Sequence, residues 1–387
     1  MILDTYLAQD LEKLHVISFD VPYPANYGGA IVVYNQLLAW KSAGVKIILH
    51  AFTYGDRQAQ AHLDEICHAV HYYERATGIK SAMSNLPYIV NSRKSVSLLE
   101  RLKKDSLPIF FEGVHTTAWI GHRDLRGRKK VLRMHNVEWQ YYQSLESLGA
   151  NALKGFYYKQ EAKRLKAYDK SALGHGDMLF TISEKDQSYY NDRHSECHLL
   201  PAAHGQRIDM KSGRGDYYLF HGKLSVADNK KSAIDLLQSV FVNTTYQLVI
   251  AGLDPDEELK KLVEQYPNIS LRANVSDAEM KTLIQNAHAN VLYTHQDNGI
   301  KLKLLHALHI GRHCIVNTAM VSNASNLAGL CQVATSIDEI ATLVKSIDNV
   351  PFTQNEIDKR AAILSQNYDN LANTKKALEI MKINGFN

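Results

Sequence analysis

Short apolar runs alternate with amphipathic segments along nearly the whole chain. The first run, Leu14–Asp20, is almost continuously apolar, which is typical of a parallel strand buried on both faces. A turn ending in Gly28 and Gly29 follows, and apolar residues then recur at helical spacing up to Gly44. The next run, Val45–Ala51, completes a strand–helix–strand unit. Its paired glycines would let the backbone approach a ligand at the helix N-terminus.

Two further predicted strands in this half of the chain end in polar clusters. The apolar runs lie in residues 108–115 and 130–138, and each carries a histidine and a carboxylate at its end. In open α/β sheets, ligands bind beyond the carboxyl ends of the strands, so these clusters indicate a site. The candidates are Glu112 and His115 after the first strand, and Arg133 and His135 after the second.

The same alternation starts afresh in the second half of the chain. The polar, glycine-containing segment Gln206–Asp216 is the best candidate for a linker. The strand Tyr217–Ser225 follows it and carries Gly222 and Lys223 near its end. Further helices and strands alternate after that, which predicts a second doubly wound parallel sheet. We therefore expect an N-terminal domain over residues 1–205 and a second domain over residues 206–365.

The stretch from Thr294 to Gly311 is the most informative in the chain. Leucines recur every third or fourth residue from Ile300 onward, which predicts a helix packed on the sheet. Asn298 is placed to cap this helix, and Gly311 stands where a left-handed C-terminal residue is expected. Gly299 removes a side chain where a ligand would approach the first turn.

Two lysines stand at the start of this predicted helix. Lys301 and Lys303 oppose the positive end of the helix dipole, and cations are usually found near helix C-termini instead. A bound anion would remove the conflict, so a phosphate or diphosphate is the expected ligand. The alternative is a solvated basic face.

Composition narrows the class of protein. The chain has 387 residues, 45% of them hydrophobic and 22% charged, as in an ordinary globular protein. A net charge of +4 is too small and dispersed to indicate a nucleic-acid partner. Four widely spaced cysteines indicate neither a zinc motif nor a disulfide framework, and they favour a reducing cytoplasm. No apolar run reaches 18 residues, so no membrane span is expected.

The segment from Gly299 to Gly311, followed by the apolar run His313–Asn317, resembles a pattern in glycosyltransferase family 4. In that family a helix with two basic residues receives the diphosphate and ribose of a nucleotide-sugar donor. Lys301 and Lys303 fall on the basic positions, and His306 falls on a ribose-binding glutamate. Asn298 falls where many members carry an acid that touches the donor sugar. Both family carboxylates are therefore missing from this chain.

The resemblance implies the GT-B fold: α/β, with two Rossmann-like doubly wound domains facing across a cleft. It also implies a C-terminal helix, Glu356–Met381. The segment of residues 366–387, which includes the end of this helix, is expected to return to the N-terminal domain. The activity it implies is transfer of a sugar from a UDP- or GDP-linked donor to a glycan or lipid-linked acceptor, with retention of configuration. No metal and no separate cofactor are expected.

The resemblance also assigns roles to residues. His115, Lys223 and Lys303 are expected to be catalytic, either beside the donor sugar or on its leaving phosphate. The remaining expected donor-binding residues are Gly28, Gly29, Arg133, His135, Gly222, Lys230, Asn274, Val275, Asp297, Asn298, Gly299, Ile300, Lys301 and His306.

The expected location is the cytoplasm, with peripheral contact at the inner face of the membrane. For the basic segment Arg93–Lys104, a solvated face is the preferred interpretation. Two alternatives to a transferase stay open. The loss of both carboxylates suits a non-catalytic nucleotide-sugar-binding protein, whereas an epimerase or hydrolase would need an acid–base pair such as Glu112 with His115.

Overall fold

The protein is described by a computed structural model that covers residues 12–78, 84–147 and 152–386. It divides into two compact units. The first contains the residues up to Gly205 and those from Tyr368 onward, and the second contains Gln206–Asn367. The change from one unit to the other after Gly205 coincides with the start of the predicted linker.

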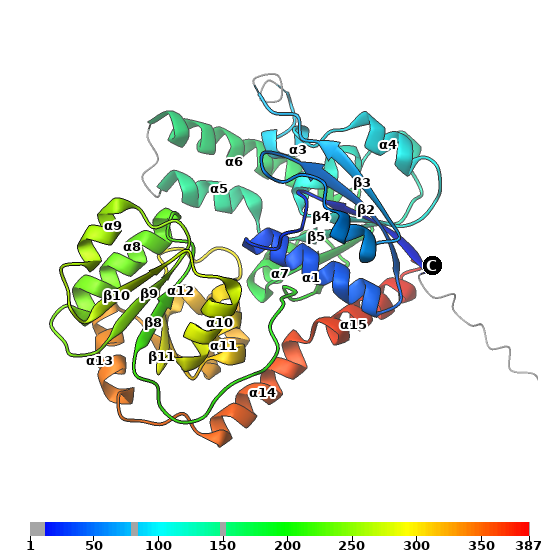
Figure 1. The fold of residues 1–387 in the computed structure, drawn as a ribbon. Coiled ribbons are helices and arrows are strands. Elements are labelled where there is room, and N and C mark those ends of the chain that lie inside the picture. The colour runs from blue at the N-terminus through cyan, green and yellow to red at the C-terminus, as the bar shows by residue number, and fades with distance from the viewer. Residues whose placement is uncertain (1–11, 79–83, 148–151, 387) are drawn as a thin grey trace, which may run out of the picture. The chain divides into compact units, whose positions relative to one another are not determined.

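The first unit is built on a seven-stranded parallel sheet with strand order β3-β2-β1-β4-β5-β6-β7 (Figure 1). The strands are β1 (Lys13–Ser18), β2 (Lys46–Thr53), β3 (Ala69–Glu74), β4 (Ile109–Glu112), β5 (Lys130–Met134), β6 (Met178–Thr181) and β7 (Cys197–Leu199). The helices are α1 (Gly28–Ser42), η1 (Ala61–Glu65), α3 (Tyr88–Asn91), α4 (Val96–Leu102), η2 (Val114–Trp119), η3 (Arg123–Leu125), α5 (Glu138–Ser147), α6 (Ala152–Leu173), α7 (Glu184–Asn191) and α15 (Asn370–Ile383).

The second unit is built on a six-stranded parallel sheet with strand order β10-β9-β8-β11-β12-β13. The strands are β8 (Tyr218–His221), β9 (Leu248–Gly252), β10 (Ile269–Ala273), β11 (Ala289–Leu292), β12 (His313–Asn317) and β13 (Gln332–Ala334). The helices are α8 (Ala227–Leu236), the π-helical η4 (Leu237–Phe241), α9 (Glu257–Val263), α10 (Asp277–Asn286), α11 (Leu302–Ile310), α12 (Thr318–Val321), η5 (Ser325–Leu330), α13 (Ile337–Ile347) and α14 (Gln354–Tyr368).

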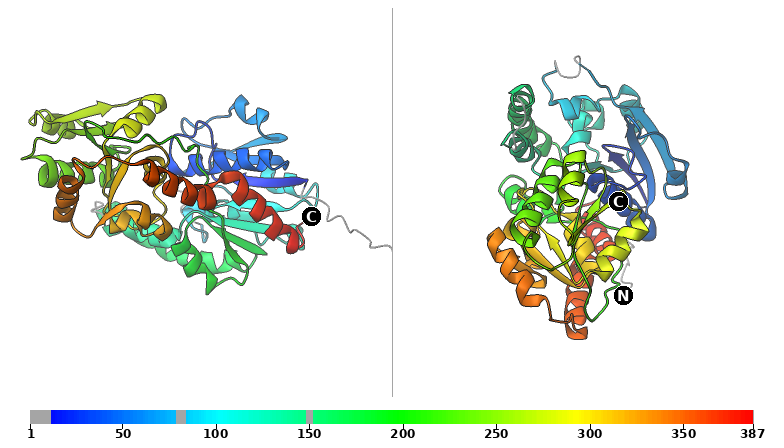
Figure 2. Two further views of the ribbon diagram at one scale, coloured as in Figure 1. Left: turned by 90° about the horizontal axis from the view of Figure 1, so that it is seen from below. Right: turned by 60° about the vertical axis from the view of Figure 1, so that its left-hand side comes forward.

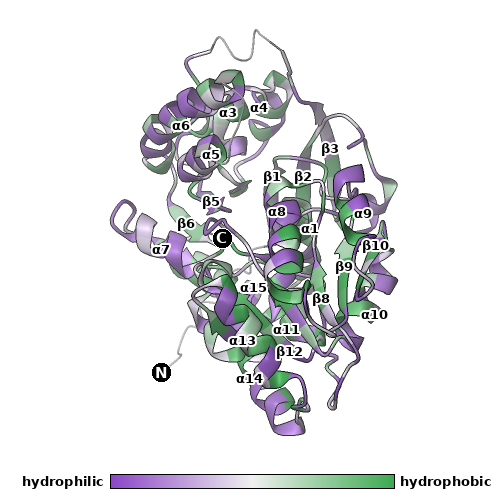
Figure 3. Ribbon diagram, turned by 90° about the vertical axis from the view of Figure 1, so that its left-hand side faces the viewer, coloured by the Kyte–Doolittle hydropathy of each residue, from purple (hydrophilic) through white to green (hydrophobic). Residues whose placement is uncertain are grey.

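Both sheets are covered on two faces, and this explains why their central strands are mostly apolar and buried. In β1, Val16 belongs to the hydrophobic cluster on one side of the sheet and Ile17 to the cluster on the other. Both residues are fully buried. Figure 3 shows the same character in β9 of the second sheet, which is coloured as hydrophobic along most of its length. The predicted pair of parallel α/β domains is therefore confirmed.

The strand order of each sheet reverses next to its first strand. In the first unit the reversal lies between β1 and β4, and in the second it lies between β8 and β11. At such a point the connections on the two sides leave toward opposite faces, which opens a crevice beyond the carboxyl ends of the strands. The topology alone therefore selects the segments after β1, β4, β8 and β11 as places for ligands.

Three details differ from the expectations. The predicted C-terminal helix is two helices, because Asp369 is extended and its carboxylate accepts a hydrogen bond from the amide of Ala372 at 2.7 Å. The second of these, α15, lies along α1 in the first unit (Figures 1 and 2), where Gln36 donates to Thr374.

The other two differences concern α11. The helix begins at Leu302 rather than Ile300, and its N-cap is Lys301, without a side-chain cap, so the prediction that Asn298 caps it is wrong. Gly311 is extended, with φ −87°, and is not left-handed. A glycine is needed there for another reason: a Cβ atom would lie 2.4 Å from the side-chain nitrogen of Asn290.

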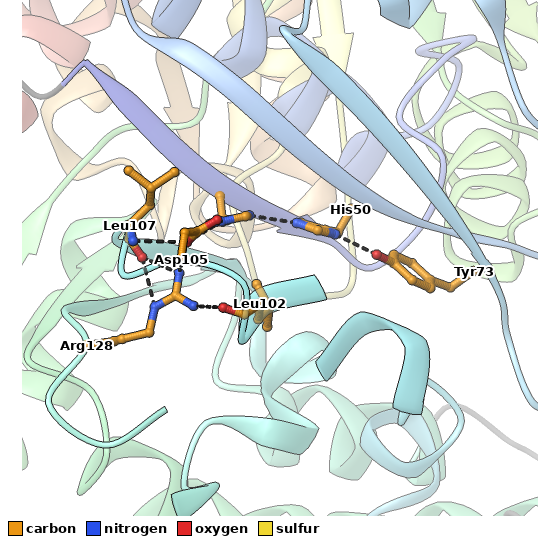
Figure 4. A network of polar contacts seen from close by, with 7 residues as sticks. His50, Tyr73, Leu102, Asp105, Leu107 and Arg128 are labelled. Carbon is orange, nitrogen blue, oxygen red and sulfur yellow. Dashed lines mark hydrogen bonds and ion pairs between the residues drawn. The ribbon is translucent and has the colours of Figure 1, made fainter. Parts of the chain in front are cut away.

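A chain of polar side chains crosses the core of the first unit (Figure 4). His15 contacts Asp105 through Nε2 at 3.0 Å and His50 through Nδ1 at 2.8 Å, and His50 contacts the hydroxyl of Tyr73 at 2.8 Å. Arg128 donates to Asp105 at 3.1 Å. If Asp105 is ionised, it accepts from His15, so His15 accepts from His50 and His50 accepts from Tyr73. Every member is then satisfied with both imidazoles neutral.

The described helices include none that is long and apolar enough to cross a membrane.

Candidate functional site

The carboxyl ends of β8 and β11 bring together most of the predicted donor-binding residues of the second unit. The backbone at the end of β9 lies very close to the backbone just after β8. A Cβ atom on Gly252, at the end of β9, would lie 1.7 Å from the carbonyl oxygen of Gly222. Gly222 in turn lies against Asn229, which donates to the carbonyl oxygen of Lys223 at 3.0 Å. These glycines let the loop after β8 and the start of α8 lie directly against the end of β9.

Lys303 is the central cation of this group. Its ammonium donates to the side-chain oxygen of Asn229 at 2.9 Å and lies 5.0 Å from the centre of the Phe220 ring. Within the described part of the chain, no carboxylate forms an ion pair with it. Burial lowers the pKa of Lys303 to about 8, with a further contribution from the charge of Lys301, although Asp228 acts in the opposite direction. Lys303 is thus a desolvated cation whose hydrogen-bond acceptor is a neutral amide.

The loop that joins β11 to α11 is held by side chains from outside it. Asp228 accepts hydrogen bonds from the hydroxyl of Thr294 at 2.7 Å and from the amide of His295 at 2.9 Å. Asn317, at the end of β12, donates to the carbonyl oxygen of Thr294 at 2.7 Å. Further along, the side chains of Ser322 and Asn323 donate to the carbonyl oxygen of Asp297. These bonds fix the backbone that leads into α11.

The backbone of this loop has the special conformation that its sequence suggested. Gly299 has φ 64°, in the left-handed region where other residues are strained. Asn298, Gly299 and Ile300 are partly exposed, and Asp297 is exposed. The ammonium of Lys301 donates back to the carbonyl oxygen of Asn298. The structure therefore places these predicted residues together at the start of α11.

The remaining predicted cations of this unit differ in how far they are neutralised. Lys223 is exposed, and its ammonium lies 3.7 Å from the carboxylate of Asp254. Lys230 forms ion pairs with both Asp256 and Glu258. Two carboxylates already balance Lys230, whereas Lys223 has one distant partner and open surroundings.

His306 lies one turn beyond Lys303 on α11. Its Nε2 is 3.1 Å from the side-chain nitrogen of Gln206, at the start of the second unit. Burial lowers the pKa of His306 to about 4, helped by the neighbouring His309 and opposed by Asp277. His306 is therefore neutral at pH 7, and burial is the main cause.

Asn274 and Val275 follow β10 at the same edge of the sheet. Asn274 has φ 54°, and its side-chain oxygen accepts from the amide of Asp254 at 2.8 Å. Its own amide donates to the carbonyl oxygen of Gly252 at 2.8 Å. This side chain is therefore used to tie the β9 and β10 loops together, and the partly exposed Val275 comes next.

In the first unit, the ring of Phe19 lies among the predicted site residues that follow β1, β4 and β5. Its ring lies 5.2 Å from that of His115 and 5.4 Å from that of His135. A Cβ atom on Gly29 would lie 2.7 Å from the Phe19 ring, so glycine is required at this position by packing. Gly28 begins α1 and is exposed. The glycine turn and the two histidines therefore surround one aromatic ring.

Glu112 is paired with His135, not with His115. Its carboxylate lies 2.7 Å from Nε2 of His135 and 3.5 Å from the guanidinium of Arg133. Burial raises the pKa of Glu112, but the charge of Arg133 and the hydrogen bond from His135 outweigh it, so the pKa is below its usual value. Arg133 has no exposed surface and also donates to the carbonyl oxygen of Pro201, which suits a structural role beside the site.

His115 is left as an uncharged side chain with spare hydrogen-bonding capacity. Burial lowers its pKa well below the usual value, and the charge of Arg93 acts in the same direction. Its Nδ1 is buried, and no described residue provides a partner. The Glu112–His115 pair that an epimerase or hydrolase would need is not formed in this structure.

Arg93 corrects another expectation. It is only 6% exposed, so it does not belong to a solvated basic face. Its guanidinium donates to the carbonyl oxygens of Phe19 at 2.6 Å and Ile89 at 2.8 Å. Burial lowers its pKa to about 10. Arg93 therefore supports the segment after β1 and adds positive potential near His115.

The described residues include no group of three or more histidine, cysteine or acidic side chains placed to hold a metal ion. The chain contains one Asp-x-Asp sequence, Asp254-Pro-Asp256. Asp256 caps α9 by accepting from the amide of Leu259 at 3.0 Å, and it also pairs with Lys230. Its carboxylate is therefore already occupied.

Comparison with known proteins supports the fold. No family model matches the chain. A Klebsiella pneumoniae protein, described as an uncharacterized 44.6 kDa protein in the cps region, is 28% identical over 350 residues, which cover 85% of this chain and 89% of that protein. Sucrose-phosphate synthase from Thermosynechococcus elongatus superposes with a TM-score of 0.70 at 13% identity, covering 96% and 98% of the two chains. Anabaena HepE in complex with UDP and glucose gives 0.67 at 12%, covering 96% and 100%.

The protein has the GT-B fold. TarM also shares it, with a TM-score of 0.66 at 8% identity over 96% of this chain and 99% of TarM. Membership of glycosyltransferase family 4 in particular stays a prediction.

Sequence reasoning missed Asp228, Phe19 and Gln206. Asp228 lies within the predicted helix region but contacts a loop 66 residues later. Phe19 looked like one more apolar residue of a buried strand. The sequence does place Asp228 two residues before Lys230, at the start of a helix that begins at the same edge of the sheet. Acids are common in the first turn of any helix, so this position alone does not mark Asp228 as a site residue.

Proposed function

We propose that the protein is a glycosyltransferase that moves a sugar from a UDP- or GDP-linked donor to a glycan or lipid-linked acceptor. The observation that carries the proposal is Lys303. A desolvated ammonium without a carboxylate partner among the described residues lies at the carboxyl edge of a parallel sheet, where its strand order reverses. A diphosphate would supply the missing negative charge.

The donor would be bound on the second unit in the following way. Lys303 and the exposed Lys223 contact the diphosphate, and the backbone of the loop Asp297–Ile300 approaches it at the left-handed Gly299. His306 faces the ribose, where the Nδ1–H of a neutral imidazole donates one hydrogen bond, because Nε2 already accepts from Gln206. Gly222, Asn274 and Val275 form the rest of the surface at the ends of β8 and β10.

The chemistry follows from the charge that develops as the bond to the sugar breaks. The leaving nucleoside diphosphate gains negative charge in the transition state, and preorganised cations stabilise it more there than in the ground state. Lys303 and Lys223 provide these charges, so the proposed reaction needs no bound metal. On the first unit, His115 would act beside the donor sugar through its free Nδ1. Retention of configuration is part of the proposal.

The similar Klebsiella protein is described as belonging to a cps region, which supports a glycan acceptor in polysaccharide biosynthesis. HepE was solved in complex with UDP and glucose, which supports a nucleotide sugar as the donor. A cytoplasmic location, with contact at the inner face of the membrane, would place the enzyme where such donors and lipid-linked acceptors meet.

The second candidate is a non-catalytic nucleotide-sugar-binding protein. Asn298 and His306, in place of two acids of the resembled family, favour it, since diphosphate contacts could persist without turnover. A thermal-shift screen with UDP, GDP and their sugars tests binding. Product analysis with the stabilising donors then distinguishes the candidates. A new glycoside supports the transferase, whereas binding without any product supports the second candidate. Absence of stabilisation by every nucleotide refutes both.

A further inference from the structure

The first unit contains a pocket at the edge of the sheet opposite to the proposed site. Its volume is about 710 Å³, and its lining includes Gly174 and Gly176, just before β6, and His194, just before β7. Glu112 and His135 lie at the other, carboxyl ends of the same parallel sheet. The four residues of β6 alone separate the two edges by roughly 13 Å. This pocket therefore lies away from the donor-binding residues proposed on the first unit.

The pocket is lined by the C-terminal parts of α6 and α7 and by the turns after them. Lys166, Asp169 and Lys170 line it from α6, and Tyr189, Asp192 and Arg193 line it from α7 and the turn after it. Packing requires a glycine at one lining position, because a Cβ atom on Gly176 would lie 2.6 Å from the side chain of Leu132.

Several of the lining side chains are held in place. Asp169 is 7% exposed and accepts from the hydroxyl of Tyr190 at 3.3 Å. The guanidinium of Arg193 lies 3.8 Å from the centre of the Tyr189 ring and donates to the Tyr189 carbonyl oxygen. The ammonium of Lys166 lies 4.4 Å from the centre of the Trp139 ring. Donors and acceptors are thus fixed on both sides of the pocket.

The chemistry of the lining selects the class of ligand. An apolar molecule would bury the charges of five lining side chains without a hydrogen bond. A simple anion would meet two carboxylates and the negative ends of two helices, because α6 ends at Leu173 and α7 at Asn191. A carbohydrate presents hydroxyl groups that donate to carboxylates and accept from ammonium and guanidinium groups. The volume lies within the range of small-molecule sites.

We propose that this pocket binds a short oligosaccharide segment, through Asp169 and Asp192 as acceptors and Lys166, Lys170 and Arg193 as donors. The site goes beyond the proposed transfer reaction, because it lies at the opposite edge of the sheet from the donor-binding residues. It would hold a glycan chain away from the reacting groups.

The experiment measures binding of lactose, maltose, cellobiose and maltotriose by saturation-transfer difference NMR, with inorganic phosphate as the anion probe. At least one of the saccharides should bind at millimolar concentration. The double variant Asp192→Ala/Lys170→Ala should weaken that binding about tenfold or more, because it removes two charged hydrogen-bonding groups. Lys163→Ala, an exposed position on α6 outside the pocket, is the matched control and should bind as the wild type does.

Nucleoside-diphosphate binding, measured by calorimetry on the same proteins, should be unchanged in all variants, which also shows that they are folded. Loss of nucleotide binding in the wild type would refute the transferase proposal but leave this one standing. The oligosaccharide site is refuted if none of the four saccharides binds. It is equally refuted if the double variant binds them normally, or if phosphate binds the pocket and displaces them.

Discussion

Replacing Lys303 with methionine tests the proposed diphosphate site most directly. The substitution keeps most of the side-chain volume beside Phe220 and removes only the charge. A hydrogen bond between charged groups contributes about 1.5–3 kcal/mol, so the dissociation constant for a nucleoside diphosphate should rise about 10- to 150-fold. Lys345→Met, on the exposed side of α13, is the matched control and should leave affinity unchanged.

The pKa of Lys303 provides a second, independent signature. Because that pKa is lowered to about 8, a growing fraction of the free protein loses the ammonium as pH rises above this value. An anion binds the protonated form better, so affinity should be constant below the pKa and then fall, by about tenfold per pH unit, above it. The diphosphate itself titrates at about 6, so measurements from pH 7.5 upward avoid its ionisation.

Isothermal titration calorimetry of UDP and GDP between pH 7.5 and 9.5 decides the question. The wild type should lose affinity with rising pH, and Lys303→Met should bind weakly with no such dependence. Equal affinity of wild type and variant at pH 7.5 would refute the assignment of Lys303 to the diphosphate. A pH dependence that persists in the variant would show that another group is responsible for it.

Three further outcomes are expected. His306→Glu should keep or strengthen nucleotide binding if residue 306 faces the ribose, whereas a variant that is insoluble or unfolded by circular dichroism would place the residue in the core instead. Any transferase activity should survive excess EDTA, and complete loss that manganese restores would mean that the leaving group depends on a metal. His50→Gln should reduce acid sensitivity. Burial lowers the pKa of His50 well below its usual value, as it lowers that of His15, so below about pH 6.5 the unfolded chain takes up protons that the folded chain excludes, and stability is lost as pH falls. Urea unfolding between pH 7 and 5 should show a smaller slope in the variant, with the difference growing toward about 1.4 kcal/mol per pH unit at pH 5, and an unchanged slope would contradict the argument.

The fold was predictable because it depends on local periodicity. A buried parallel strand is apolar throughout, and a covering helix repeats its apolar residues every three to four positions, so the alternation is visible in the sequence. The strand His313–Asn317 has the expected bounds. The errors occur where the presence of a given residue has two possible physical explanations. Gly311 was expected to be left-handed, but close packing against Asn290 explains the glycine.

The candidate site was predictable only in part, because its geometry depends on contacts between distant residues. The lysines at the start of α11 could be recognised from their conflict with the helix dipole. The difference between Lys303, which has no carboxylate partner among the described residues, and Lys230, which has two, could not be recognised from the sequence. The acids that neutralise Lys230 lie 26 and 28 residues further along the chain. Arg93 looked like one charge of a solvated segment, although its guanidinium holds the backbone after β1.

The replacement of two acids by Asn298 and His306 does not by itself argue against a working donor site. The loop before α11 is held by Asp228, Asn317 and Asn323, which bind the backbone or side chain of other loop residues, so its course does not depend on an acid at position 298. Diphosphate binding is assigned to Lys303, whose surroundings are likewise independent of that position. In the proposed site, diphosphate binding and choice of the sugar therefore depend on separable groups. The missing acid at position 298 bears on which sugar is transferred, and on whether one is, more than on whether the diphosphate binds. The replacement at His306 bears instead on how firmly the ribose is held.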